Sequence, residues 1–315
     1  MKVFKIALLA AGAHSAVACD LCAIYSANQA HAELGRGPFA GVAEQYTHFG
    51  SVQQDGERVD NPSGQYMDSS ISQLFVGYNI NRRFGVQFTA PIIYRNYKRP
   101  DNAGGIEHGS ESGLGDVSLF GNYLAYRLSQ MDRTLNWNLI GGVKFPTGST
   151  DRIKEEFAEV ENPVGPPSGI HGHDLTLGTG SYDGIVGTSA YGRWQKMFVT
   201  GNVQYFIRTK GDFDYRFANE LIWSFAPGYY IVLDERFTVT FQAVASGEYK
   251  GKDKFQGETA DDTGLTAVYL GPAVGFTWHE NLSADLGADL PVLLHNTSFQ
   301  SVPDFRIHAG ITWRF

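Results

Sequence analysis

Four segments of the chain alternate between apolar and polar residues with a period of two, which is the pattern of a β-strand that separates two different environments. At the end of the chain, Phe305 and Ile307 fall on one side of the strand, and Arg306 and His308 fall on the other. The other three segments with this period are residues 135–145, 237–246 and 281–296. Each of the four segments is therefore predicted to be a strand with one apolar face and one polar face.

Further strands are expected along the rest of the chain and bring the predicted total to about twelve, an even number, as in bacterial outer-membrane barrels. They are expected at residues 37–50, 69–80, 84–97, 113–128, 183–192, 197–209, 217–232 and 264–277. Alternation by itself does not identify the architecture, because the strands of a soluble β-sandwich also have one apolar face and one polar face. The connections between the strands must decide.

The predicted connections alternate between short turns and long polar loops. The short turns are residues 81–83, 129–133, 193–196, 234–235 and 279–281, and the long loops are residues 51–68, 98–112, 146–182, 210–216, 248–263 and 295–304. In an outer-membrane barrel all short turns lie at the periplasmic end and all long loops at the extracellular end, whereas a sandwich has no reason to sort its loops. The sequence thus predicts an all-β fold, a transmembrane antiparallel up-and-down β-barrel over residues 37–315.

The first residues are organised as a secretory signal. Lys2 and Lys5 precede an apolar run at residues 6–13, and Ala16-Val17-Ala18 forms a cleavage site. We therefore expect a cleaved signal peptide at residues 1–18 and export to the outer membrane of a Gram-negative bacterium. The terminal Phe315 resembles the C-terminal signature that the barrel assembly machinery reads, so this machinery and outer-membrane lipid are expected partners.

Composition excludes other classes of protein. The chain carries 25 basic and 33 acidic residues, a formal charge of −8, whereas nucleic-acid binders normally have a basic face. It has only two cysteines, which excludes a disulfide-rich scaffold. Both lie in the Cys19-Asp20-Leu21-Cys22 segment at the expected new N-terminus, within a predicted periplasmic or plug segment at residues 19–36.

Several roles are open for Cys19 and Cys22. Their spacing allows a disulfide, a metal site completed by other ligands, or a lipid on the first cysteine. Covalent haem attachment is not expected, since that signature needs histidine where the chain has Ala23. The segment also resembles the N-terminal C-x-x-C of barrels that sheathe multihaem cytochromes, and that resemblance implies a periplasmic partner as an alternative function.

The polar faces of the predicted strands supply candidate pore-lining residues. These are Asp116, Arg127, Lys144, Arg208, Glu220, Asp285, Asp289, Arg306, His308 and Arg314. Both signs of charge are present, so salt-bridged networks across a water-filled lumen are the favoured interpretation and a substrate track is the alternative. Apolar residues interrupt this face at Ile140, Val244, Val268 and Leu293, so that part of the interior could accept a hydrophobic or aromatic solute.

The longest loop, residues 146–182, is expected to form a lid or to fold into the barrel, because it is acidic and contains Pro163, Pro166 and Pro167. It also contains His171-Gly172-His173-Asp174. These side chains could contribute metal ligands, but a short fragment in an acidic loop is more often solvated, and we expect no metal site and no cofactor.

Three motifs resemble one outer-membrane family. They are GLGDVSLFGNY at residues 113–123, KFPTGS at 144–149 and LGTGSYDGIVGTSAYGRW at 177–194, and they are similar to those of the transporter family named for the meta-pathway of phenol degradation. The resemblance implies a barrel that helps hydrophobic or aromatic compounds cross the outer membrane. The glycines and aspartates of the motifs are expected to be structural, with Asp116 and Asp183 capping turns or pairing with arginines of the lumen.

The function expected from these observations is a channel for passive passage of small hydrophobic or aromatic solutes, gated by the 146–182 loop and the N-terminal segment. A lipid- or peptide-hydrolysing enzyme is the alternative from another class. It is not favoured, because neither His295 nor His308 accompanies a recognisable nucleophile motif.

Overall fold

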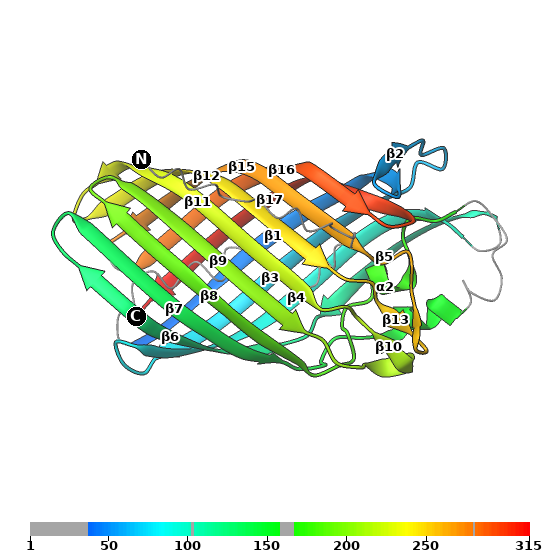
Figure 1. Cartoon of the computed structure of the whole chain (residues 1–315), viewed down its shortest axis with the longest axis horizontal. Helices are drawn as coiled ribbons and strands as arrows, with labels where there is room; N and C mark the ends of the chain where they lie inside the picture. Colours follow the sequence, from blue (N-terminus) through cyan, green and yellow to red (C-terminus); the bar gives the residue numbers. More distant parts are fainter. Residues whose placement is uncertain (1–36, 102–103, 158–166, 280) are drawn as a thin grey trace, which may run out of the picture.

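Long antiparallel strands form one closed barrel in the computed structural model, which describes residues 37–101, 104–157, 167–279 and 281–315 (Figure 1). In this part of the chain the barrel has twelve strands, as the sequence predicts. They are β1 (Gly37–Gln54), β3 (Tyr66–Asn79), β4 (Phe84–Pro100), β6 (Ser118–Ser129), β7 (Arg133–Lys144), β8 (Asp183–Trp194), β9 (Met197–Ile207), β11 (Glu220–Leu233), β12 (Phe237–Lys250), β15 (Leu265–Trp278), β16 (Leu282–Asn296) and β17 (Phe299–Arg314).

The last strand pairs with the first and closes the sheet. The pairing of β1 with β17 runs from Phe39 opposite Arg314 to Gln54 opposite Phe299, with an irregularity near Phe49. Closure removes the free edges of the sheet, so that the backbone N–H and C=O groups of every barrel strand find partners within the wall. None of the helices in the described residues is long and apolar enough to span a membrane.

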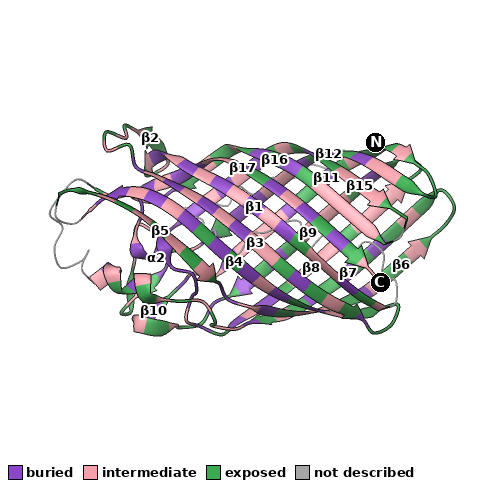
Figure 2. Cartoon of the chain, turned by 180° about the vertical axis from the view of Figure 1, so that it is seen from behind, coloured by how far each residue is buried: buried purple, intermediate pink, exposed green. Residues whose placement is uncertain are grey.

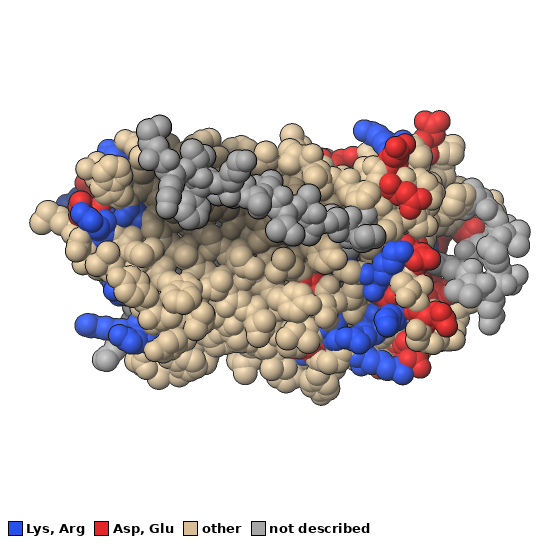
Figure 3. Space-filling view, in the orientation of Figure 1, with Lys and Arg blue, Asp and Glu red and all other residues tan. Residues whose placement is uncertain are grey.

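Side chains alternate between the two faces of the wall, as predicted. On β17 the outward Ile307 and Ile311 are exposed, while the inward Arg306 and His308 are buried, and Figure 2 shows the same alternation along the other strands. On the face drawn in Figure 3, charged side chains gather at the two ends of the barrel, and the wall between them is almost free of charge. An uncharged apolar band of this kind is the surface that lipid covers.

The sorting of connections is also confirmed. The short turns lie at one end of the barrel, and the long loops, with the small elements β2 (Glu57–Val59), β10 (Tyr215–Arg216), β13 (Lys254–Phe255) and α2 (Gly172–Leu175), lie at the other (Figure 1). Several strands extend into segments predicted as loops, because their hydrogen-bonded ladders continue above the apolar band. β12, for example, ends at Lys250 and so includes Glu248.

The predicted strand at residues 113–128 is two strands. β5 (Ile106–Leu114) pairs with the upper part of β4, and β6 pairs with its lower part, so the wall strand is interrupted at residues 115–117. Asp116 lies in this interruption, and its carboxylate accepts backbone hydrogen bonds from Gly148 and Thr179. Residues 106–112, predicted as loop, are correspondingly strand.

Two apolar residues assigned to the lumen lie on the outer face instead. Val268 lies between Ala267 and Tyr269, which are fully buried on the inner face, and Leu293 is 48% exposed. The alternation of β15 is regular, and it places Val268 outside. On β16 the register shifts, because Val268 lies opposite Leu293 and Tyr269 lies opposite Pro291, which leaves Val292 as an extra residue. One extra residue turns the side chains beyond it to the other face, and sequence alternation does not reveal it.

The outer face of β1 and β3 carries one acidic group within the apolar band. Glu44 lies on the face opposite the inward Ala43 and Gln45, next to the outward Val42. Its carboxylate accepts hydrogen bonds from Ser70 Oγ at 2.5 Å and from Ser72 Oγ on the neighbouring strand. The two hydroxyls compensate a charge that lipid cannot solvate.

Substitution of Ser72 by alanine is expected to destabilise the barrel, because it removes a hydrogen bond to a carboxylate that has no water beside it. Such a bond is worth about 1.5–3 kcal/mol. Denaturant unfolding in lipid vesicles measures the loss. In the Glu44→Leu background the same Ser72→Ala substitution should cost much less, and an equal cost in both backgrounds would contradict the pairing.

Candidate functional site

The three sequence motifs meet around the carboxylate of Asp116 inside the extracellular end of the barrel. Lys144 Nζ lies 2.5 Å from Asp116 Oδ2, and Thr179 N donates to the same oxygen at 2.9 Å. Gly148 N donates to Asp116 Oδ1 at 3.0 Å. Residues from all three motifs thus bind one side chain, which explains why these segments occur together in one sequence.

The glycines of the motifs permit close contact between two backbone segments. A Cβ atom placed on Gly148 would lie 2.5 Å from the carbonyl oxygen of Leu177, and one on Gly178 would lie 2.5 Å from the carbonyl oxygen of Gly148. Neither position accommodates a side chain. The structural role expected for the motifs is therefore confirmed at these glycines.

A chain of buried ion pairs continues from Asp116 along the inner wall. Lys144 also pairs with Asp183 at 2.8 Å, Asp183 with Arg208 at 2.9 Å, and Arg208 with Glu220 at 3.1 Å. All five side chains are buried. Four of the charged residues that the sequence assigned to the lumen thus form one salt-bridged network with Asp183, and this network joins β7, β8 and β11 to the residues just before β6 and just after β9.

A second polar group lies deeper in the lumen. Arg306 Nη2 is 2.5 Å from Glu248 Oε1, and Tyr269 Oη donates to the same oxygen at 2.8 Å. His308 Nε2 lies 3.5 Å from Asp289 Oδ2. Arg306, His308 and Asp289 are therefore placed as predicted. Glu248 was missed, because the sequence assigned it to a loop, although the alternation of β12 continues through it.

The remaining candidates lie elsewhere along the inner wall. Arg127 is exposed near a periplasmic turn, Arg314 is opposite Phe39 at the periplasmic end, and Asp285 is half-buried on β16 opposite Gly310. Within the described chain, none of these three belongs to either of the two groups above. Cys19 and Cys22 lie outside the described residues.

The 146–182 loop folds into the barrel, as predicted. Leu177 packs in an apolar cluster with side chains on the inner faces of β1, β3 and β4, namely Phe39, Ala43, Ile71, Phe75 and Ile93. Above this cluster, Ile170 and Leu175 pack with Phe49, Met67 and Tyr97. The described parts of the loop therefore occupy one side of the lumen, and the opposite side keeps the polar groups.

Arginines that the sequence did not single out hold this loop. Arg95 donates to the carbonyl oxygen of Thr176 at 2.5 Å, and Arg99 Nη2 pairs with Glu155 at 2.6 Å. Arg152 of the loop pairs with Glu111 of β5 at 2.5 Å. The alternation of β4 places Arg95 and Arg99 on its inner face, so the sequence could have identified both as lumen residues. Their partners could not be predicted, because only the folded loop brings them close.

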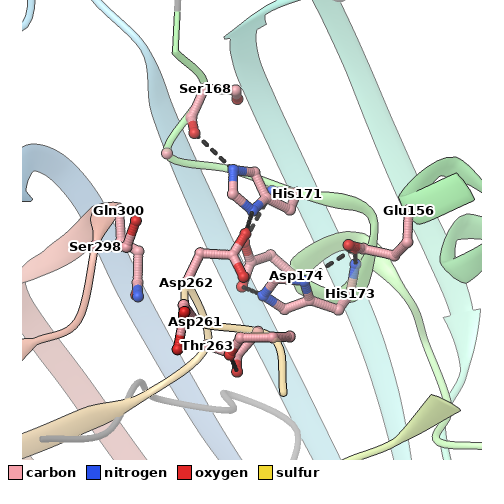
Figure 4. A network of polar contacts seen from close by, with 12 residues as sticks. Glu156, Ser168, His171, His173, Asp174, Asp261, Asp262, Thr263, Ser298 and Gln300 are labelled. Atoms are coloured by element: carbon pink, nitrogen blue, oxygen red, sulfur yellow. Dashed lines mark hydrogen bonds and ion pairs between the residues drawn. The ribbon is translucent and has the colours of Figure 1, made fainter. Parts of the chain in front are cut away.

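His171 connects the 146–182 loop to the loop before β15, and His173 pairs with a carboxylate within the 146–182 loop (Figure 4). His171 Nδ1 lies 2.7 Å from Asp262 Oδ2, and His173 Nδ1 lies 2.9 Å from Glu156 Oε1. The expectation that this segment is solvated was wrong, since His173 is 4% exposed. Within the described residues, no group of three or more His, Cys, Asp or Glu side chains is arranged to hold a metal ion.

The histidines and carboxylates shift each other's titration. Burial by itself would lower the pKa of His173, but the negative charges of Asp174 and Glu156 outweigh burial and raise this pKa well above its ordinary value. Burial would raise the pKa of Asp262, but the hydrogen bond and charge of His171 lower it instead. Both pKa shifts show that the folded loops favour the charged forms of His173 and Asp262.

Comparison with known proteins gives a match to one family model and a shared fold. The family model described as "Putative MetA-pathway of phenol degradation" matches residues 163–292, a range that includes the third motif, and the resemblance drawn from the sequence is confirmed. The fold is similar to that of an outer membrane channel from Pseudomonas putida F1, with a TM-score of 0.64 and 16% identity over 90% of this chain and 98% of that chain. A search of curated proteins finds no match to the chain.

Other solved barrels are more distant. The β domain of the Bordetella autotransporter BrkA has a TM-score of 0.44 and 13% identity, over 89% of this chain and 100% of that chain. The translocator domain of the autotransporter NalP from Neisseria meningitidis has a TM-score of 0.44 and 11% identity, over 92% of each chain. The likeness to the Pseudomonas channel is the one that establishes an outer-membrane barrel fold.

The pairs in Figure 4 predict a pH-dependent loop. The pKa of His173 is higher in the folded loop than in the unfolded chain. Protonated His173 therefore stabilises the loop fully at pH values below its pKa in the unfolded chain, and this stabilisation is lost as the pH rises through its pKa in the folded loop. The pKa of Asp262 is lower in the folded loop, so ionised Asp262 stabilises the loop above its pKa in the unfolded chain, and this stabilisation is lost as the pH falls through its pKa in the folded loop.

Hydrogen exchange of residues 170–176, corrected for intrinsic rates, should be slowest from mildly acidic to neutral pH and rise at alkaline pH. His173→Gln should abolish the alkaline rise, and an unchanged profile would refute the role of this pair.

Replacing Asp116 by asparagine is expected to destabilise the barrel by about 3 kcal/mol, because breaking a buried ion pair leaves a charge without compensation. The estimate lies at the lower end of the usual range since Asp183 still contacts Lys144. Unfolding in denaturant measures it. The matched change Asp132→Asn, at an exposed ion pair in a periplasmic turn, should have little effect. Equal stabilities of the two variants would show that the motifs do not depend on this carboxylate.

Proposed function

We propose that the protein is an outer-membrane channel for passive passage of small hydrophobic or aromatic solutes. One observation carries the proposal: the closed barrel retains a cavity in mid-lumen, lined by residues of β1, β9, β11, β12, β16 and β17, with about 510 Å³ of empty space that includes open solvent. Cavities that combine apolar walls with a few polar groups are the usual binding sites of small organic molecules. The name of the matched family, which refers to phenol degradation, supports the aromatic class, and the Pseudomonas channel supports the location.

A second cavity extends the path toward the periplasm. It has about 350 Å³ of empty space, part of it open to solvent, and lies near the periplasmic turn after β3. Its lining combines aromatic and aliphatic side chains with amides, as Phe39, Phe120, Ile140, Asn79, Gln87 and Asn122 show. Ring faces and amide groups together suit a solute with an apolar body and one polar substituent.

The charges of the lumen support a channel for small organic solutes over an ion-selective pore. Positive and negative side chains are paired along the wall, so no ring of one sign surrounds the path. The same pairing supports a channel over an enzyme, because the buried carboxylates and bases bind one another. The barrel supplies a path, and no step in it requires a cofactor.

The 146–182 loop is proposed as the gate. Its apolar contacts with β1, β3 and β4 and its arginine anchors hold it against one side of the lumen. Solute passage would then depend on how often these contacts open. The proposal includes a cleaved signal peptide at residues 1–18, assembly by the barrel machinery, and a periplasmic segment at residues 19–36 that could hold a partner through Cys19 and Cys22.

Uptake tests the proposed function. A strain that lacks this protein should take up limiting concentrations of aromatic compounds more slowly than the same strain carrying the wild-type gene, over a panel of aromatics, alkanes and fatty acids. Equal uptake of every compound by the two strains would overturn the channel proposal. The panel also identifies which class is preferred.

If the 146–182 loop is the gate, a substitution that displaces it should raise the permeability of the barrel. Leu177→Asp places a charge in the apolar cluster that seats the loop and should raise conductance in planar bilayers several-fold. Lys154→Ala, in the same loop but exposed, is the control and should conduct like the wild type. A Leu177→Asp barrel that folds and conducts no better than the control would exclude gating by this loop.

A further inference from the structure

The mid-lumen cavity has an excess of hydrogen-bond acceptors. Its lining includes three buried oxygens that accept no hydrogen bond from any described residue, namely Glu248 Oε2, Asp289 Oδ1 and Gln204 Oε1. The three residues are between 1% and 5% exposed. Buried acceptors without donors are rare in folded proteins, because they lose their hydration without compensation.

The two basic side chains of the lining already lie beside carboxylates. Arg306 pairs with the other oxygen of Glu248, and its guanidinium lies 3.5 Å from the centre of the Tyr269 ring. His308 lies beside the other oxygen of Asp289. The lining thus places two carboxylates against one guanidinium. A ligand that donates hydrogen bonds would pair with the three oxygens, and a positive charge on it would compensate the second carboxylate.

An apolar surface continues from these oxygens toward the periplasm. Ser224 and Ser246 line the cavity, and the next inward positions on their strands are Ala226 and Val244. These two side chains pack with Ala273 of β15 in a buried cluster. An apolar group attached to the donor would therefore lie against small aliphatic side chains instead of charges.

We propose that this cavity is a subsite for primary amines with an aromatic or aliphatic body. The ammonium group donates to Glu248, Asp289 and Gln204, and the apolar body lies along Ala226 and Val244. An ammonium group carries three N–H donors, and hydrogen bonds between charged groups are stronger than those between neutral groups. This inference rests on the proposed channel function and names a substrate class for it.

Three compounds of nearly equal shape test the subsite: 2-phenylethylamine, 2-phenylethanol and phenylacetate. Isothermal titration calorimetry on the mature full-length chain in detergent micelles at neutral pH measures their binding. The amine should bind about tenfold more tightly than the alcohol, which is about 1.4 kcal/mol, and phenylacetate should bind more weakly than either. Asp289→Asn should weaken binding of the amine far more than binding of the alcohol and so remove the preference for the amine.

Gln204→Leu provides a second variant that does not alter an ion pair, and it should weaken binding of the amine several-fold. Asp132→Asn, in an exposed turn, makes the same chemical change as Asp289→Asn outside the lumen and should leave all three affinities as in the wild type. Heat-modified mobility in gels confirms that each variant is folded. Equal binding of amine and alcohol, no binding of the amine, or an Asp289→Asn variant that keeps the preference would each overturn the subsite. Because binding is measured directly, these outcomes are independent of the uptake experiment that tests the channel.

Discussion

The pairing of every backbone polar group inside a lipid bilayer is the constraint on which the rest of this structure depends. Lipid offers no hydrogen bonds, so a sheet that crosses it must close upon itself, and here β17 closes the ring on β1. Closure fixes two faces with opposite requirements. The outer face must be apolar, and the few polar groups it carries, such as Glu44, must find partners within the wall.

The inner face has the opposite problem, because its charges are enclosed in a narrow space with limited access to water. The chain meets this by pairing them, in a line from Asp116 to Glu220 near the extracellular end and around Glu248 and Asp289 deeper down. Enclosed charges are stable when paired and costly when separated. The places where pairing is incomplete are therefore informative about ligands.

The inserted loop links these requirements to permeability. Its apolar residues pack against Phe39, Ile71 and Phe75 on the inner faces of β1 and β3. Its glycine motifs and the Asp116 carboxylate anchor it beside the ion pairs. The described parts of the loop thus fill part of the lumen, and the proposed transport path follows the space that remains.

The sequence by itself determined the strands, their inner and outer faces and the sorting of turns and loops, because a period of two and a turn composition are local properties that survive in any context. It also located most of the lumen charges, such as Lys144 and Arg306. Only the tertiary structure decided which charges meet, since Arg306 and its partner Glu248 lie on strands far apart in the chain, and that distance closes only in the folded barrel. Bulges escaped prediction for a related reason: one extra residue on β16, Val292, exchanges the inward and outward faces of that strand without changing its composition. The break at Asp116 likewise depends on partners from two later segments, so no local pattern could have placed it.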